Sequence, residues 1–229
     1  MSEPKDHPRV ALLHVADRTG IVEFAHSLIA LGFELVATGP TATALRQAEA
    51  KHISLSEFTD ERLPADALAL LHPKIVGAVV GEKPRIDLVA VNLYPLAQAT
   101  ADSSLTQEEV LSYVDPAGPT LLRAAARNFS RVIPLCDPDD YQQAVETLKA
   151  YDRMLPDRRQ ILAAKAFHYA AYYDSTVAQY LGGKWEKLPD EVVVALKKSI
   201  DLRYGENPHQ SGAFYTLSVA RPWGLNAAK

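Results

Sequence analysis

Short apolar runs alternate with amphipathic segments over the first two thirds of the chain, and this alternation limits the possible folds most. The runs Val10–Ala16, Phe33–Thr38, Ile86–Leu93 and Arg131–Cys136 have the length and apolar character of buried strands. Segments with helical spacing of their apolar residues separate these runs. Alternation of this kind favours an α/β fold, in which a wound parallel sheet is flanked by helices.

The segments between the runs carry their own helix signals. Gly20–Leu31 has apolar residues three and four positions apart, and a second helix is expected around Ala42–Glu49. A helix over Thr120–Asn128 follows a turn rich in proline and glycine. Asp137–Tyr151 is expected to be helical, with Asp137 as its N-cap and a proline in its first turn.

The pattern changes after residue 151 and predicts a C-terminal helical and strand extension. Pro156–Leu181 reads as one long helix, and Glu191–Leu196 as a strand that leads into Asp201–Tyr215. One face of the long helix is aromatic. Its side chains are Phe167, Tyr169, Tyr172, Tyr173 and Tyr180. Aromatic residues at helical spacing usually pack, so this face is expected to be a core stripe or a subunit contact.

Charge and cysteine content exclude several classes of function. The 24 basic and 28 acidic residues give a net charge of −4, so the chain lacks the basic field of a nucleic-acid-binding protein. Cys136 is the only cysteine and lies in an apolar run, where it is expected to be buried and inert. Without an apolar signal segment or a membrane-spanning stretch, the chain is expected to be cytoplasmic, with no membrane partner.

Ligands of an open parallel sheet bind beyond the carboxyl ends of its strands, so the loops after the expected strands are the candidate sites. Two of these loops end a strand and open a helix, and they contain Thr19, Thr38, Gly39 and Thr41. Free backbone N–H groups, a glycine and hydroxyls suit a phosphate at a helix N-terminus. A Gly-Pro-Thr turn taken alone is more often a plain helix start, and Thr41 could simply be the cap of that helix.

Polar groups also follow the later strands. Asn92 and Tyr94 close the most apolar run, and Asp115 precedes the helix over Thr120–Asn128, where it could serve as a cap or as a site residue. Arg127 on that helix could point toward a ligand or into solvent. His72 and His209 are candidate acid–base groups. No histidine pair has a metal-ligand spacing with a carboxylate partner, so no metal site is expected.

Taken together, these segments resemble the IMP cyclohydrolase domain of the bifunctional AICAR transformylase/IMP cyclohydrolase, from about Val10 to Tyr215. The matching strings are Asp17-Arg18-Thr19-Gly20-Ile21-Val22-Glu23-Phe24-Ala25, Leu71-His72-Pro73-Lys74-Ile75, Val91-Asn92-Leu93-Tyr94-Pro95, Leu121-Leu122-Arg123-Ala124-Ala125-Ala126-Arg127-Asn128 and Asp201-Leu202-Arg203-Tyr204-Gly205-Glu206-Asn207-Pro208-His209-Gln210. The resemblance implies a methylglyoxal-synthase-like fold. It also implies closure of the purine ring, in which formyl-AICAR loses water to give IMP. Such an intramolecular reaction needs mainly orientation, proton transfer and stabilisation of an oxyanion, so the resemblance implies no metal or organic cofactor.

The resemblance also implies site residues. Asp115 and Tyr94 match the family's active-site aspartate and tyrosine, and Asn92 matches an asparagine that contacts the substrate. Arg127 stands for an active-site lysine, so Asp115, Tyr94 and Arg127 are the expected catalytic residues. The expected substrate-binding residues are His14, Arg18, Thr19, Thr38, Gly39, Thr41, Asn92 and Gly118.

Several positions depart from the family's strings. The family's Ser-Val-Ser-Asp-Lys-Thr-Gly becomes His14–Gly20, its Asp-Ile-Gly-Gly becomes Asp115–Gly118, and its catalytic lysine becomes Ala69. The expected substrate is therefore formyl-AICAR or a purine-analogue nucleotide. The alternative is a catalytically impaired nucleotide-binding subunit that pairs with a separate transformylase. Methylglyoxal synthase itself is disfavoured, since it offers no place for the long helix or for Asp201–Gln210.

The domain organisation is expected to follow the same resemblance. Residues 1–200 are expected to form the cyclohydrolase-like domain, and residues 201–229 resemble the opening segment of a transformylase domain, whose body is expected to be absent. A homodimer through the long helix and the C-terminal segment is expected, because the aromatic side chains there would otherwise be exposed. A purine-precursor nucleotide is the expected small-molecule partner.

Overall fold

A computed structural model describes residues 8–63, 67–81, 85–182 and 190–217 of the chain. The strands are β1 (Arg9–Val15), β2 (Phe33–Ala37), β3 (Leu88–Asn92), β4 (Ile133–Leu135), β5 (Leu196–Leu202) and β6 (Gly212–Leu217). The α-helices are α1 (Ile21–Ala30), α2 (Gly39–Gln47), α3 (Leu55–Thr59), α4 (Pro73–Val80), α5 (Leu96–Ala101), α6 (Gln107–Ser112), α7 (Gly118–Arg127), α8 (Tyr141–Tyr151) and α9 (Pro156–Gly182). The 3₁₀ helices are η1 (Ala67–Leu71) and η2 (Pro138–Asp140).

Four parallel strands form the sheet in the order β2-β1-β3-β4. The chain runs outward from β1 to β2 and then returns to place β3 on the other side of β1. The point of reversal therefore lies between β1 and β3. In wound α/β sheets, the crevice at such a reversal is the usual ligand site. The predicted α/β class with a parallel sheet is confirmed.

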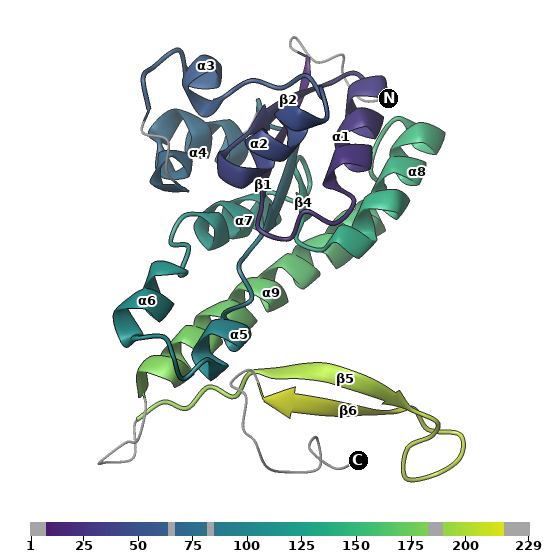
Figure 1. Cartoon of the computed structure of the whole chain (residues 1–229). Helices are drawn as coiled ribbons and strands as arrows, with labels where there is room; N and C mark the ends of the chain where they lie inside the picture. The colour runs from purple at the N-terminus through teal and green to yellow at the C-terminus, as the bar shows by residue number, and fades with distance from the viewer. Residues whose placement is uncertain (1–7, 64–66, 82–84, 183–189, 218–229) are drawn as a thin grey trace. The chain divides into compact units, whose positions relative to one another are not determined.

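Each face of the sheet is covered by helices (Figure 1). Alternate residues of β1, such as Leu13, pack with Phe24 of α1 and Leu148 of α8 in one buried core. The opposite face of the strands packs against α7, which in turn contacts α4. Both faces of the sheet are therefore buried, which explains why the sequences of the strands are nearly continuous apolar runs.

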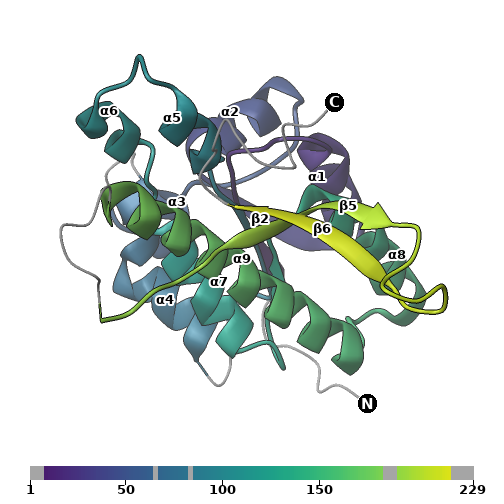
Figure 2. The same ribbon diagram turned by 90° about the horizontal axis from the view of Figure 1, so that it is seen from below.

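The chain folds into two compact units, comprising residues 1–94 with 115–170 and residues 95–114 with 171–229. The domain boundary predicted at residue 200 lies within β5, and the two units divide the chain at other positions. α9 begins in the first unit and its C-terminal part belongs to the second. The second unit also contains α5, α6 and a two-stranded antiparallel ribbon of β5 and β6 (Figure 2).

Several predicted boundaries need correction. The predicted strand Glu191–Leu196 is wrong, because β5 starts only at Leu196, where pairing with β6 begins. α2 starts at Gly39 rather than Ala42, since proline at its second position suits a first helical turn. Asp137 does act as a cap, but of η2, which precedes α8.

Two further predictions concern burial. Cys136 is 5% exposed, and burial raises the pKa of its thiol to about 12, as expected of an inert cysteine. The aromatic face of α9 is mixed: Tyr173 is buried, whereas Phe167 is 44% exposed. Within the described parts of the chain, no helix is long and apolar enough to cross a membrane.

Candidate active site

The carboxyl ends of β1, β2 and β3 bring together loops that are far apart in the sequence. β1 ends at Val15, β2 at Ala37 and β3 at Asn92, and the segment before α7 reaches the same edge through Asp115. Sequence reasoning assigned site residues to each of these loops. The structure shows which of them meet.

His14 joins two of the predicted residues directly. Its Nδ1 lies 2.6 Å from the hydroxyl of Thr38, and its Nε2 lies 2.9 Å from Oδ2 of Asp115. The side chains of His14 and Asp115 are only 16% and 15% exposed. Three residues from three separate segments thus form one hydrogen-bonded line, which we call the Thr38–His14–Asp115 cluster.

The carboxylate of Asp115 has three nitrogen neighbours within hydrogen-bond distance. Its Oδ1 accepts the backbone N–H groups of Ala117, at 2.8 Å, and Gly118, at 2.9 Å, while Oδ2 faces His14. Burial alone would raise the pKa of Asp115. The hydrogen bonds from His14 and from these backbone N–H groups outweigh burial and hold the pKa below its usual value. Asp115 therefore carries a negative charge at neutral pH.

Gly118 is required by the close approach of Asp115. A Cβ at this position would lie 2.5 Å from Oδ2 of Asp115 and 2.8 Å from a methyl carbon of Leu93. Real Cβ atoms do not tolerate such distances, so any side chain here displaces the carboxylate or the leucine. Gly39 differs in kind, because its φ of +51° is the left-handed conformation that favours glycine at the start of α2.

The loop between β1 and α1 is held by Asn92. The side-chain oxygen of Asn92 accepts the backbone N–H of Asp17 at 2.7 Å, and its amide nitrogen donates to the Asp17 carbonyl at 2.8 Å. Asp17 in turn accepts the hydroxyl and the backbone N–H of Thr19. These two hydrogen bonds, the hydroxyl first, lower the pKa of Asp17. Asn92 thus fixes the position of the loop that carries Thr19.

Thr41 is likewise engaged with the backbone. It is fully buried, and its hydroxyl accepts the N–H of Val15 at 2.9 Å and donates to the carbonyl of the same residue at 3.1 Å. It therefore ties the start of α2 to the end of β1. Thr41 does not cap α2, which was the alternative interpretation, because a cap would accept a helical N–H instead.

Tyr94 stands two residues beyond β3 and is 37% exposed. Sequence reasoning missed the residue that supports this segment. The hydroxyl of Tyr169, on α9, accepts the backbone N–H of Leu93 at 2.8 Å. Tyr169 was counted only as a member of an aromatic face, and no sequence pattern distinguishes it there.

Other candidate residues lie outside the cluster. Arg127 is exposed at the last turn of α7, nine residues or about 13 Å along the helix from Gly118 at its start. Arg18 is exposed between β1 and α1. His72 caps α4 through Nδ1, and its Nε2 lies 3.1 Å from Glu61. His209 is exposed in the loop that joins β5 to β6.

Ala69, which the sequence resemblance matches to a lysine of the family, is 4% exposed within η1. A methyl group can neither carry a charge nor transfer a proton. The positive charge and the titratable group that the resemblance implies at this position are therefore missing here.

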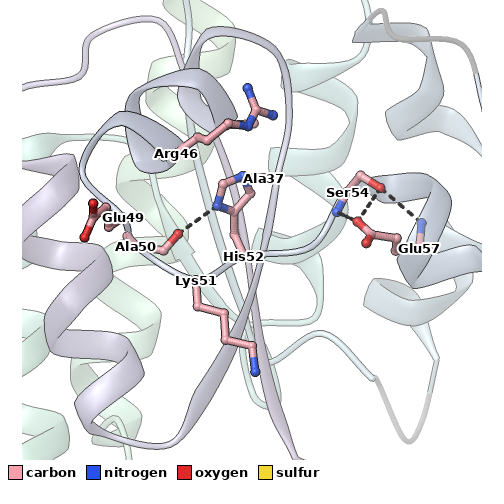
Figure 3. A pocket seen from close by; sticks show the side chains of 9 residues that line it. Ala37, Arg46, Glu49, Ala50, Lys51, His52, Ser54 and Glu57 are labelled. Carbon is pink, nitrogen blue, oxygen red and sulfur yellow. Dashed lines mark hydrogen bonds between the residues drawn. The ribbon is translucent and has the colours of Figure 1, made fainter.

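A cavity of about 410 Å³ lies beside the last residue of β2, Ala37, and the end of α2 (Figure 3). Arg46, Lys51 and His52 give it basic groups. Nδ1 of His52 is bonded to the carbonyl of Ala50, while Glu57 is committed to Ser54 in a capping box. A second cavity, of about 480 Å³, lies between α1 and α8. Neither cavity is lined by His14, Thr38 or Asp115.

Comparison with known proteins agrees with this architecture. Residues 20–114 match the MGS-like domain, the class of domain that the parallel sheet and its flanking helices define. Residues 125–228 match the AICARFT/IMPCHase bienzyme. The chain belongs to the AICARFT/IMPCHase family, as an α/β chain with an MGS-like fold.

The relatives are long compared with this chain. It is 44% identical over 220 residues to the bifunctional purine biosynthesis protein PurH of Chloroflexus aurantiacus. That match covers 90% of this chain and 42% of the relative. PurH of Myxococcus xanthus is 40% identical over 227 residues, and the match covers 92% of this chain and 44% of that relative. The chain thus spans less than half the length of these relatives. The crystal structure of ForH superposes with a TM-score of 0.67 at 31% identity, covering 76% of this chain and 99% of ForH.

Proposed function

We propose that this protein closes the purine ring, converting formyl-AICAR to IMP or performing the same chemistry on a purine-analogue nucleotide. Membership of the AICARFT/IMPCHase family supports a role in purine biosynthesis. The observation that carries the proposal is the Thr38–His14–Asp115 cluster at the reversal point of the sheet. The cluster combines a part-buried carboxylate and an imidazole at the carboxyl edge of the sheet, the edge at which wound sheets usually bind ligands.

The proposed nucleotide lies along this edge. Its phosphate binds at the starts of α1 and α2, near Thr19, Thr38 and Gly39, where backbone N–H groups and helix dipoles favour an anion. Arg18, exposed in the same loop, adds the positive charge. Asn92 and Thr41 contribute by holding these loops, because their side-chain hydrogen bonds are made to the backbone.

The reacting end of the nucleotide is assigned to Asp115 and Tyr94. The low pKa of Asp115 makes its carboxylate a weak base, so its role is to orient polar groups and to stabilise developing positive charge. Tyr94, which follows β3 and is 37% exposed, is assigned the role of donor to the formyl oxygen. Arg127 is not assigned to the reacting end, because it lies in the last turn of α7 and Gly118 lies in the first.

One observation favours a second candidate function. Ala69, which is buried, takes the place of a lysine in the family's sequences. The alternative is therefore a nucleotide-binding subunit that lacks catalysis and pairs with a separate transformylase. Both candidate functions predict nucleotide binding, but only the first predicts turnover of formyl-AICAR. Tight IMP binding without conversion of formyl-AICAR would select the alternative.

The test compares the wild type with Asp115→Asn. Ultraviolet absorbance follows conversion of formyl-AICAR to IMP, and calorimetry measures IMP affinity. We expect turnover by the wild type and a loss of about 10²–10³-fold in kcat for Asp115→Asn, because one electrostatic group is removed, with IMP affinity nearly unchanged. Equal rates for the two proteins would contradict the assigned site.

We further propose that the protein acts in the cytoplasm as a homodimer. Support comes from the ribbon of β5 and β6, whose apolar side chains are unusually exposed. They include Leu196, Ile200, Leu202, Tyr215 and Leu217, each at least 40% exposed. A two-stranded ribbon is marginally stable by itself, and an apolar surface of this kind is typical of a protein interface.

A further inference from the structure

The backbone leaves the sheet at Leu93, one residue beyond the end of β3. The carbonyl of Asn92 accepts the backbone N–H of Ala16 at 3.2 Å, on the side of β1. Successive residues of a strand turn their backbone groups to opposite neighbours, so Leu93 directs its N–H and C=O away from β1. On that side, pairing with β4 has already ended at Ala90 and Leu135. Within the described part of the chain, the sheet therefore offers Leu93 no strand partner.

A side chain from α9 takes the place of that strand. The hydroxyl of Tyr169 accepts the N–H of Leu93 at 2.8 Å and donates to the carbonyl of the same residue across 3.4 Å. Leu93 is 4% exposed, so its backbone has little access to water. A buried backbone group without a partner destabilises the fold, and this one hydroxyl satisfies two such groups.

The helix that carries Tyr169 is fixed about one turn earlier. Nζ of Lys165, four residues before, lies 2.7 Å from a carboxylate oxygen of Asp137 and 2.7 Å from one of Asp140. Both carboxylates belong to the segment that follows β4. Residues four apart share a helix face, so one face of α9 contacts the segments after β4 and after β3. The hydroxyl of Tyr169 is therefore held by an anchored helix.

Leu93 lies between the two groups that are assigned to the reacting end of the nucleotide. Tyr94 is the next residue in the chain. The side chain of Leu93 packs against Gly118, where a Cβ would lie 2.8 Å from its methyl carbon, and the N–H of Gly118 donates to Asp115 at 2.9 Å. A shift of the Leu93 backbone therefore moves Tyr94 directly and disturbs the packing of the turn that holds Asp115.

We propose that Tyr169 is a positioning residue of the ring-closing site. Its hydroxyl holds the backbone of Leu93 and thereby sets the place of Tyr94 relative to the carboxylate of Asp115. This inference rests on the proposed function, in which those two groups act on the reacting end of the nucleotide. Tyr169 acts through Leu93 and does not contact the substrate. The phosphate is bound by other loops, at the starts of α1 and α2, so Tyr169 affects the rate more than the affinity.

The contact itself can be tested without any substrate, by hydrogen exchange of the Leu93 amide. Tyr169→Phe keeps the ring on α9 and removes only the hydroxyl. We expect the Leu93 amide to exchange at least about 10-fold faster in this variant, because its hydrogen bond is lost. The matched control is Tyr172→Phe, a half-buried tyrosine of the same helix, which should leave this exchange rate unchanged. Equal exchange in the wild type and Tyr169→Phe would overturn the inference.

Kinetics test the consequence for catalysis. Tyr169→Phe should lower kcat for formyl-AICAR by about 10-fold or more and change KM by less than about 2-fold, because a displaced catalytic group slows the reaction without weakening phosphate binding. Tyr172→Phe should leave both constants unchanged. A residue that only stabilised the fold would lower the resistance to urea and leave kcat of the folded protein as it was.

A double-variant cycle identifies the group through which Tyr169 acts. Tyr94→Phe removes the phenol hydroxyl that Tyr169 is proposed to position. In this background, Tyr169→Phe should reduce kcat by a factor at least about 3-fold smaller than it does in the wild type, because the two changes disable one function. Losses that simply multiply would show that the two residues act independently and would overturn the inference.

Urea unfolding of each variant checks that its fold is intact under the assay conditions. An active wild type, with the kcat of Tyr169→Phe equal to that of Tyr172→Phe, would overturn this inference and leave the proposed function standing. A wild type that does not convert formyl-AICAR would overturn both.

Discussion

Gly118 is the residue on which the geometry of Asp115 depends most. Because an added Cβ would lie 2.5 Å from Oδ2, Gly118→Ala should push the carboxylate away from His14. We expect kcat to fall by at least about 10-fold, because displacement of a catalytic group from its productive position lowers the rate. The measurement is turnover of formyl-AICAR together with thermal unfolding.

Gly77 in α4 offers the matched control, because a Cβ there meets nothing within 4 Å. Gly77→Ala should leave turnover unchanged and stabilise the protein by about 0.5–1 kcal/mol, as expected for glycine replaced in a helix. Equal losses of turnover in the two variants would show that close approach to Asp115 is irrelevant.

Asp115 also predicts a pH dependence of stability. Because its pKa is lower in the folded protein than in the unfolded chain, its charge stabilises the fold above the unfolded value of about 3.9. This contribution is lost as pH falls through that value toward the folded pKa. In urea unfolding, the difference between the wild type and Asp115→Asn should be largest near pH 6 and shrink by pH 3.5. A difference that grows on acidification would contradict this assignment.

Sequence reasoning selected His14, Thr38 and Asp115 separately, each as a match to a family position. It could not find the bonds between them, because these depend on the register of β1 beside β2 and on the path of the chain before α7. For Thr41 and Asn92, by contrast, the role predicted from the sequence differs from the contacts in the structure. A hydroxyl and an amide in site loops were interpreted as ligand groups, yet their hydrogen bonds go to the backbone of Val15 and Asp17.

The end of β3 and the loop before α1 form one structural element through Asn92. Asn92→Ala removes two hydrogen bonds at a position that is 4% exposed, so it should lower the free energy of unfolding by about 1–3 kcal/mol. KM should rise more than kcat falls, because the loop with Thr19 loosens. Gln142→Ala, an exposed change on α8, should alter stability by no more than about 0.5 kcal/mol. Equal effects of the two changes would refute this account of Asn92.

The elements of the sheet were predictable because both of its faces are buried, which gives continuous apolar runs. β5 was not, because every one of its residues is exposed and its sequence has no apolar alternation to mark its start. α2 begins earlier than predicted for a different reason. The expected helix began at Ala42, after Gly39 and Pro40, whereas a left-handed glycine followed by proline is compatible with the first helical turn.

The exposed ribbon of β5 and β6 determines what is expected of assembly. If this surface forms the homodimer, Ile200→Lys should convert the dimer to a monomer, because an ammonium group would be buried against apolar side chains. Light scattering over a range of concentrations measures this directly. Lys197→Glu, a polar change on the same strand, is the control and should leave the mass unchanged. A wild-type mass of one chain at every concentration would rule out the dimer.

The central claim is that the nucleotide binds at the Thr38–His14–Asp115 cluster. Titration of the nitrogen-15-labelled protein with IMP, followed through its backbone amide signals, tests this most directly. We predict saturable shifts at Thr19, Gly39 and Gly118, and at the ring of His14. Saturable shifts confined to the cavity lined by Arg46, Lys51 and His52, with the cluster unchanged, would contradict it.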